Sequence, residues 1–405
     1  MSHTFDAIVV GARCAGSPTA MLLARRGYRV LLLDRAHFPS DTVSTHVVHP
    51  LGVAALARWG LLERLQATGC PPVATYAYDF GPFTLAGSPG TAESPVAYCP
   101  RRTVLDKLLV DAAVEAGAEL REGFLVDELV LEGERVVGVK GHDRSGTPVT
   151  ERASIVIGAD GRHSRLAAAL RPPTYNEKPP LLAAYYTYWS NLPMDGRFET
   201  WIRPHRGFAA VPTHDGLTLV IAGWPHAEMD ANKDDIEGHY LETLALSPAF
   251  AERVHGARRE ARFFGASVPN WFRKPFGPGW ALVGDAGYNK DPITAQGITN
   301  AFHDAERCAQ AVDEVLGAGR PFDEAMGDYQ QARDRNALPM YEFTCELATL
   351  EPPPQPMQEL FRAIHGNQAA TDDFVRANAG TISPAAFFAP ANVGAIMAAA
   401  QATRH

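Results

Sequence analysis

Short apolar runs and a helical segment alternate at the start of the chain. Asp6–Val10 and Tyr28–Leu33 are apolar runs typical of buried parallel strands. The segment Ser17–Arg26 between them carries consecutive apolar residues, and Gly27 is a typical helix stop, so a helix is predicted here. The order strand, helix, strand is that of a dinucleotide-binding unit and indicates an α/β fold.

The pattern of apolar and polar positions also predicts the later elements. Helices are expected at 51–65, 102–117, 230–246, 294–316 and 321–350. Strands are expected at 119–130, 135–140, 148–157 and 280–283, with a hairpin turn at 132–134. The stretch from 173 to about 276 is β-rich and aromatic and predicts a second layer, and short helices are expected after 351.

Composition and charge limit the class of protein. The 405 residues are enough for two or three domains, and the net charge of −9 argues against a nucleic-acid or anionic-membrane partner. No apolar run is long enough for a membrane span, and the first strand begins too early to leave room for a signal peptide. The five cysteines form no C-x-x-C motif, which argues against a zinc site or a redox disulfide. We therefore expect a cytoplasmic protein without a metal.

The turn after the first strand carries the first candidate chemistry. Gly11 permits a tight turn, and Gly16 permits close packing of the helix on the strand. The helix N-terminus then presents free N–H groups to a pyrophosphate, and Asp34 after the second strand can accept hydrogen bonds from a ribose. Arg13 stands where the G-x-G-x-x-G fingerprint has its middle glycine. Its guanidinium is expected either to contact phosphate or to turn outward.

Two further strands are followed by turns that contain a glycine and an aspartate, as expected of cofactor-binding turns. Asp160 and Gly161 come after a buried strand, and Gly284 and Asp285 come after the short strand at 280–283. Asp285 is well placed to bind the hydroxyl groups of a ribityl chain. The helix that opens near 294–297 aims N–H groups at the same region, where it would stabilise the negative charge of a reduced flavin by up to about 2 kcal/mol.

With these three motifs in order, the chain resembles FAD-dependent monooxygenases of the aromatic hydroxylase (para-hydroxybenzoate hydroxylase-like) type. Their wider superfamily includes geranylgeranyl reductases and flavin halogenases. The resemblance covers nearly the whole chain, and it implies that Arg102 contacts FAD and that Val126 lies beside the adenine. The chain departs from the family pattern at Arg13, and at Tyr288, where many hydroxylases have a histidine.

The resemblance also implies a domain organisation. The expected fold is α/β, with a Rossmann-like FAD-binding domain of the glutathione-reductase type interleaved with a β-sheet substrate domain and followed by a helical C-terminal cap. The FAD-binding domain is assigned to 1–75, 98–172 and 277–350, the substrate domain to 76–97 and 173–276, and the cap to 351–405.

The candidate cofactor-binding residues lie in the three motifs or beside them. They are Gly11, Ala12, Arg13, Ala15, Gly16, Asp34, Arg35, Arg102, Val126, Asp160, Gly284, Asp285, Gln296, Gly297 and Ile298. The chain has no second G-x-G-x-x-G. NAD(P)H is therefore expected to visit transiently as the reductant, or a separate flavin reductase to supply reduced flavin.

The family resemblance implies an oxidoreductase reaction. Reduced FAD would capture O2 as a C4a-hydroperoxide and transfer one oxygen atom to an electron-rich substrate. We therefore expect hydroxylation of an aromatic or polyketide-like small molecule. A flavin-dependent double-bond reductase stays open. Halogenation is disfavoured because both tryptophans of the Trp-x-Trp-x-Ile-Pro motif are missing at Gly207–Pro212, and a non-catalytic flavoprotein is disfavoured by the large second domain.

Individual polar and aromatic residues are weaker signals. His46, Tyr288 and Lys290 are candidates for catalysis, with a structural histidine and a solvated turn as the alternatives, and no catalytic base can be named. The candidates for substrate binding share the β-rich region or the turn after the third motif, and they are Tyr185, Trp201, Arg203, Phe208 and Pro292. Core positions are the alternative for the aromatic residues, and a surface hairpin is the alternative for Arg203.

Overall fold

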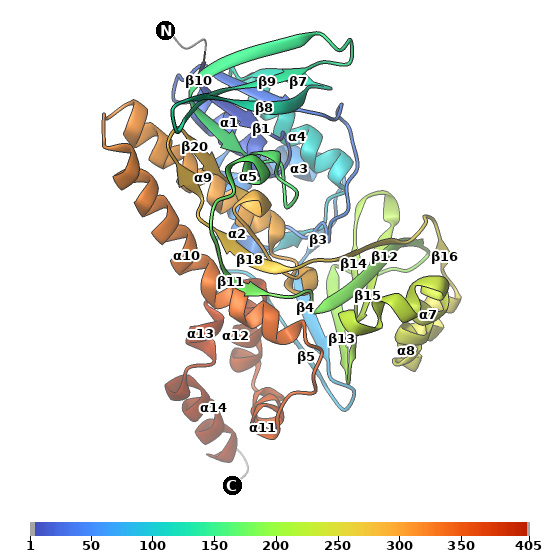
Figure 1. The fold of residues 1–405 in the computed structure, drawn as a ribbon. Helices are drawn as coiled ribbons and strands as arrows, with labels where there is room; N and C mark the ends of the chain where they lie inside the picture. Colours follow the sequence, from blue (N-terminus) through green and yellow to red (C-terminus); the bar gives the residue numbers. More distant parts are fainter. Residues whose placement is uncertain (1–4, 403–405) are drawn as a thin grey trace.

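A twisted, mainly parallel sheet organises the first layer of the computed structural model, which describes residues 5–402 (Figure 1). Its central strands run in the order β7-β2-β1-β10-β20, and the neighbouring pairs in this order are parallel. These strands are β1 (Phe5–Val10), β2 (Val30–Asp34), β7 (Glu119–Glu122), β10 (Pro148–Gly158) and β20 (Trp280–Leu282). This is the strand order of a doubly wound dinucleotide-binding sheet.

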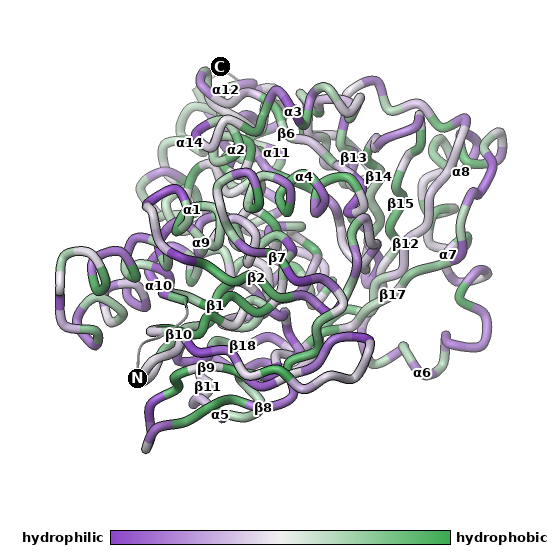
Figure 2. The backbone as a smooth tube through the Cα atoms, turned by 90° about the horizontal axis from the view of Figure 1, so that it is seen from above, coloured by the Kyte–Doolittle hydropathy of each residue, from purple (hydrophilic) through white to green (hydrophobic). Residues whose placement is uncertain are grey.

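Both faces of this sheet are buried, as continuous apolar strands require. Ala7 and Val9 of β1 pack in the core under the helices, whereas Ile8 and Val10 pack in a second core on the opposite face. The helical face is covered by α1 (Gly16–Ala24), α4 (Arg102–Glu115) and α9 (Gly297–Leu316), and the other face by α5 (Arg165–Leu170) and the hairpin β8 (Leu125–Glu132) and β9 (Arg135–His142). Figure 2 shows hydrophobic residues gathered in β1 and β2 near the centre of the molecule.

Two elements expected as single pieces are divided, and a left-handed glycine explains each break. The helix expected at 51–65 is two helices, α2 (Pro50–Arg58) and α3 (Leu62–Ala67), because Gly60 between them has φ of +74°. The strand expected at 119–130 is β7 followed by β8, because Gly123 between them has φ of +67°. Both predictions of one continuous element are therefore wrong, whereas the hairpin turn expected at 132–134 is confirmed.

A second, largely antiparallel sheet forms the β-rich layer, in the order β16-β12-β15-β14-β13-β4-β5. Its strands are β4 (Thr75–Asp79), β5 (Thr84–Gly87), β12 (Leu182–Ser190), β13 (Arg197–Arg203), β14 (Arg206–Pro212), β15 (Thr218–Pro225) and β16 (Arg258–Arg259), with β17 (Phe264–Ser267) paired to β12. One face packs on α7 (Ile236–Ala245) and α8 (Pro248–His255) through Trp201, Phe208 and Phe250. The helix expected at 230–246 is α7, preceded by the short α6 (Met229–Asn232).

The helices near the end of the chain lie on the side of this second sheet away from α7 and α8 (Figure 1). They are α10 (Phe322–Leu347), α11 (Gln355–Ile364), α12 (Gln368–Ala379), α13 (Pro384–Phe387) and α14 (Pro390–Ala402). Leu85 and Leu219 of the sheet share one core with Phe361 and Phe374 of α11 and α12. The helical cap expected after 351 therefore packs on the sheet as part of the fold.

Short strands complete the structure. They are β3 (Pro72–Val73) paired with β6 (Ala97–Tyr98), the edge strand β19 (Phe276–Gly277), and a small sheet of β11 (Thr174–Lys178), β18 (Asn270–Arg273) and β21 (Tyr288–Asn289). Among residues 5–402, no helix has both the length and the apolar character needed to cross a bilayer. The residue ranges assigned to the three domains stay a prediction, and their outermost residues at both chain ends lie outside the described residues.

Candidate functional site

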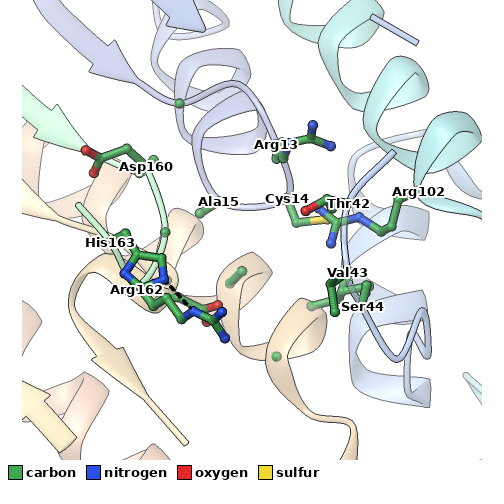
Figure 3. Close-up of a pocket in the computed structure, with 18 of the residues that line it drawn as sticks. Arg13, Cys14, Ala15, Thr42, Val43, Ser44, Arg102, Asp160, Arg162 and His163 are labelled. Atoms are coloured by element: carbon green, nitrogen blue, oxygen red, sulfur yellow. Dashed lines mark hydrogen bonds between the residues drawn. The ribbon is translucent and has the colours of Figure 1, made fainter. Parts of the chain in front are cut away.

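A cavity of about 900 Å³ lies where the carboxyl ends of β1, β2 and β10 meet the turn after β20. It is lined by residues of all three expected motifs, including Gly11, Asp34, Asp160 and Asp285. Figure 3 shows Arg13, Cys14 and Arg102 on one side of the cavity and Asp160, Arg162 and His163 on the other. Ligands of doubly wound sheets bind in this position, outside the carboxyl ends of the strands.

Two glycines shape the turn beside this cavity. Gly11 has φ of +102°, and a Cβ there would lie 2.4 Å from the Ala159 carbonyl oxygen. A Cβ on Gly16 would lie 1.7 Å from the Gly11 carbonyl oxygen. The strand, the turn and α1 therefore approach one another too closely for any side chain at these positions.

Asp34 is fixed by the backbone that surrounds it. One of its carboxylate oxygens accepts a hydrogen bond from the Ala12 N–H at 2.7 Å, and the other accepts one from the Ala36 N–H at 2.7 Å. The carboxylate also lines the cavity. Each oxygen keeps lone-pair capacity for a ribose hydroxyl, so the geometry suits the role expected of this acid.

Arg13 binds the loop that follows β2 through hydrogen bonds of its guanidinium group. Its Nη1 donates to Asp106 Oδ2 at 2.5 Å and to the Ser40 carbonyl at 3.1 Å, and its Nη2 donates to Ser40 Oγ at 2.9 Å. Phe38 lies under the same guanidinium, 5.4 Å from its carbon to the ring centre. Both terminal nitrogens are thus bound by protein atoms, so the side chain points to Asp106 and Ser40 and not outward, and these contacts favour a structural role over a phosphate contact.

We expect Arg13→Ala to act mainly on stability. The free energy of unfolding of the FAD-free protein should fall by about 1.5 kcal/mol, the lower end for hydrogen bonds to charged groups, because the side chain is partly exposed. The dissociation constant for FAD should change less than tenfold. Denaturant unfolding and FAD titration measure the two quantities, with Arg64→Ala in an exposed ion pair as the control. A larger loss of FAD affinity with unchanged stability would mean that Arg13 contacts phosphate.

Asp106 is a functional residue that sequence reasoning missed. It is fully buried on α4, where its carboxylate binds Arg13, accepts from Arg102 Nε at 3.1 Å and Nη2 at 2.9 Å, and accepts from the Cys14 thiol at 3.3 Å. These contacts hold Arg102 against the cavity and leave its Nη1 without a hydrogen bond to any of the described residues. The spacing Arg102 to Asp106, one helical turn, was the available sequence signal.

The Gly284–Asp285 turn is held from behind by α10. Arg333, which is buried, donates to the Gly287 carbonyl at 3.2 Å, and the Tyr329 hydroxyl donates to the Leu282 carbonyl at 2.8 Å. The side chain of Asp285 is exposed and lines the cavity. The turn is therefore fixed by helix residues that lie 46 and 47 positions further along the chain than the carbonyls they bind.

Four buried polar atoms around the cavity have no hydrogen-bond partner among the described residues. They are Asp160 Oδ1, Lys290 Nζ, Asp291 Oδ2 and Asn300 Nδ2, and all four residues line the cavity. Buried polar groups without partners are costly, so this wall suits a polar ligand that would satisfy them. Donors, acceptors and the fingerprint turn together fit a dinucleotide cofactor.

A second cavity, of about 670 Å³, adjoins the first between the second sheet and the cap. Its wall is mainly aromatic and aliphatic, with the rings of Tyr78, Phe80, Phe198, Phe361 and Phe374. The two cavities share the residues at their junction, which are Thr45, Ala184, Ile221, Pro292 and Ala295. A small apolar molecule in the second cavity would thus face whatever fills the first.

His49 fixes one side of this junction. Its Nδ1 accepts from the Tyr76 hydroxyl at 2.8 Å, and its Nε2 donates to the Thr294 carbonyl at 3.0 Å. Burial lowers the pKa of His49 to about 4, so the ring is neutral at physiological pH. His49 therefore positions the turn Pro292–Thr294.

The comparison with protein families agrees with this geometry. A family model described as "FAD binding domain" matches residues 4–344. The chain belongs to this FAD-binding family. It is an FAD-dependent oxidoreductase, and the resemblance to the superfamily of aromatic hydroxylases, geranylgeranyl reductases and flavin halogenases is confirmed.

Relatives of this FAD-dependent oxidoreductase carry three different reaction names. A tryptophan 2-halogenase of Chondromyces crocatus is 25% identical over 80% of this chain and 64% of its own, so the chain spans less than two thirds of that relative. A digeranylgeranylglycerophospholipid reductase of Methanosarcina mazei is 26% identical over 79% and 77%. A 6-methylpretetramide 4-monooxygenase of Streptomyces rimosus is 28% identical over 75% and 74%.

Solved structures agree on the fold. A flavoprotein/dehydrogenase from Cytophaga hutchinsonii superposes with a TM-score of 0.83, with 17% identity and coverage of 99% of this chain and 100% of that one. The α/β prediction with an FAD-binding domain is thereby confirmed. At these identities, neither the relatives nor the structures decide which reaction this oxidoreductase performs.

Most of the expected cofactor residues of this oxidoreductase line the first cavity. They are Gly11, Arg13, Ala15, Asp34, Arg35, Arg102, Val126, Asp160, Gly284, Asp285, Gly297 and Ile298. The other three lie behind its wall. The Ala12 N–H binds Asp34, Gly16 packs on Gly11, and Gln296 donates to the Asn378 carbonyl. Their roles toward FAD stay predictions.

The catalytic candidates separate into two groups. Tyr288 and Lys290 line the first cavity, and the Tyr288 ring and the Lys290 Nζ are buried, which disfavours the solvated-turn alternative. His46 lines neither cavity. It is fully buried with φ of +65°, and its Nε2 forms a short hydrogen bond with the Tyr188 hydroxyl. This placement favours the structural alternative for His46.

The substrate candidates are also divided. Pro292 lies at the junction of the cavities, and Trp201, Arg203 and Phe208 border the second cavity. The rings of Trp201 and Phe208, however, stack on each other at 4.6 Å under α8, and Arg203 is paired with Asp79 at 2.8 Å. Tyr185 stacks on Trp224 and lines neither cavity. Ala209 follows Phe208 on β14, so its side chain points to the opposite face of the sheet, where it lines the second cavity.

Proposed function

We propose that this oxidoreductase is an FAD-dependent monooxygenase that hydroxylates an aromatic or polyketide-like small molecule, with NAD(P)H as transient reductant. The observation that carries the proposal is the apolar, ring-lined second cavity that meets the cofactor cavity at five shared residues. Its size suits a drug-sized organic molecule. The relative named 6-methylpretetramide 4-monooxygenase supports the same reaction class.

The residues of the chain have defined tasks in this proposal. Bound FAD supplies the redox and oxygen chemistry. The rings of Tyr78, Phe198 and Phe374 hold a flat apolar substrate and exclude water from the junction. His49 fixes the junction turn through the Thr294 carbonyl. Arg203 is neutralised by Asp79, so the second cavity suits a neutral molecule better than a carboxylate.

The reductant follows from the number of dinucleotide units. The described residues contain one parallel sheet with one fingerprint turn, which supports a single resident cofactor. NAD(P)H then binds transiently, and a separate flavin reductase is the alternative source of electrons. Rapid reduction of the bound flavin by NADH or NADPH alone would favour the first route.

A double-bond reductase is the second candidate. A mainly apolar second cavity also suits a hydrocarbon chain, and one relative is named as a digeranylgeranylglycerophospholipid reductase. Halogenation has the weaker support from this chain. The strand β14, Arg206–Pro212, borders the second cavity without the two tryptophans expected of halogenases.

A turnover screen tests the proposal. Purified protein with NADH or NADPH is supplied with phenols, flat polyketide-like aromatics and an isoprenoid lipid, and products are analysed by mass. We expect an aromatic compound to stimulate NAD(P)H and O2 consumption and to gain one oxygen atom. A product that gains two hydrogen atoms instead, without O2 consumption, would replace this proposal by the reductase.

A further inference from the structure

Lys290 is a buried ammonium group in the wall of the cofactor cavity. It follows β21, and its Nζ is buried and has no hydrogen-bond partner among the described residues. The Tyr288 ring centre lies 5.2 Å from Nζ. A buried ammonium group without a hydrogen-bond partner is costly to the folded protein even with the carboxylates of Asp285 and Asp304 nearby, so its presence beside a ligand cavity points to a task with the ligand.

The position of Lys290 selects one half of the cofactor. Asp34 marks the adenosine end of the cavity, because the acid after the second strand binds the adenosine ribose. The isoalloxazine half must then extend toward the opposite end. Pro292, two residues after Lys290, lines both cavities and marks that end. Lys290 therefore belongs to the wall around the flavin ring.

We propose that Lys290 supplies the positive charge that stabilises the reduced flavin at the junction of the two cavities. The inference rests on FAD binding and is independent of the oxygen-transfer reaction. A hydride from NAD(P)H brings two electrons and one proton to the ring and leaves NAD(P)⁺. The ring then carries one negative charge near N1 and C2=O. A buried ammonium attracts this charge more strongly than it would in water.

The groups that face Lys290 allow its charge to be followed by pH. They are Asp285, Tyr288, Asp291, Asp304, Cys345 and His49. Burial lowers the pKa of Lys290 to about 8. It raises the pKa values of Asp291 to about 7, Asp304 to about 6 and Cys345 to about 11. Burial also raises the pKa of Asp285, moves that of Tyr288 well upward and lowers that of His49 to about 4. Between pH 8 and 10, Lys290 is therefore the member of this group that titrates.

Substitution of Lys290 tests the proposal through the midpoint potential of the bound flavin at pH 7. Lys290→Met should make reduction at least tenfold less favourable, which for two electrons lowers the potential by about 30 mV. Lys290→Arg keeps the charge and should keep most of the wild-type potential. Lys140→Met removes a lysine from an exposed ion pair with Glu128 and should change nothing. An unchanged potential in FAD-loaded Lys290→Met would overturn the proposal.

The wild-type protein provides a second test that needs no variant. Below its pKa of about 8 the lysine is charged in both redox states, so it takes up no proton of its own when the flavin is reduced to the anion. Above about pH 8 the lysine is neutral beside oxidised flavin, and the new negative charge raises its pKa, so reduction should take up two protons. The measurement is the midpoint potential of the bound flavin as a function of pH. A slope that corresponds to one proton per two electrons at every pH up to 10 would overturn the proposal, even if Lys290→Met fails to hold FAD. Neither test uses a substrate, so failure of the hydroxylation proposal would leave both intact.

Discussion

Gly16→Val should give a colourless protein that does not retain FAD. The first side-chain atom would lie 1.7 Å from the Gly11 carbonyl oxygen and 3.1 Å from the Ala159 Cβ. The clash is with a backbone carbonyl, which cannot rotate away as a side chain could. At least one of the turn, α1 and β10 would therefore have to move. We expect the free energy of unfolding to fall by more than about 4 kcal/mol, the range of severe core disruptions. Absorbance of the purified protein and denaturant unfolding measure the two effects.

Gly327→Ala is the matched control for this prediction. Gly327 lies in α10, and a Cβ there would meet nothing within 4 Å. The variant should bind FAD normally and be slightly more stable, because alanine favours helix by about 1 kcal/mol over glycine. A yellow Gly16→Val protein with normal FAD content would contradict the cofactor turn described above.

Ala209→Trp should abolish substrate turnover and spare the flavin. Ala209 on β14 pairs with Ile221, which lines both cavities, and Ala209 itself lines only the second. An indole at this position would fill the space next to the junction. We expect kcat/KM for the substrate to fall at least a hundredfold, about 2.7 kcal/mol of transition-state stabilisation.

FAD content and substrate-free NAD(P)H oxidation serve as internal controls for Ala209→Trp, and both should stay near wild type. Leu241→Trp on the exposed surface of α7 controls for the added indole and should leave turnover unchanged. Turnover that survives in Ala209→Trp would show that the substrate does not use the second cavity.

Local patterns allowed much of the cofactor half to be predicted. The apolar runs of β1 and β2, the turn glycines and Asp34 are all close in sequence, and each follows from a steric or hydrogen-bonding requirement. The breaks at Gly60 and Gly123 were not predicted, because a glycine within an apolar pattern does not reveal the sign of its φ.

Contacts between distant segments account for the rest. Asp106 binds Arg13 across more than ninety residues, and the second cavity is closed by Phe361 and Phe374, which also follow the sheet by more than ninety residues. The orientation of Trp201 depends on Phe250 of α8. None of these pairings has a sequence period, so the pattern predicted aromatic residues in a β-rich layer but not which of them would face a substrate.

The fate of molecular oxygen tests the central claim most directly. The protein is turned over with NAD(P)H and the best substrate of the screen, once under labelled O2 in ordinary water and once under ordinary O2 in labelled water. We expect one labelled atom in the product of the first reaction and none in the product of the second. A product that carries no label from O2, and has gained two hydrogen atoms or a halogen instead, would contradict mono-oxygenation.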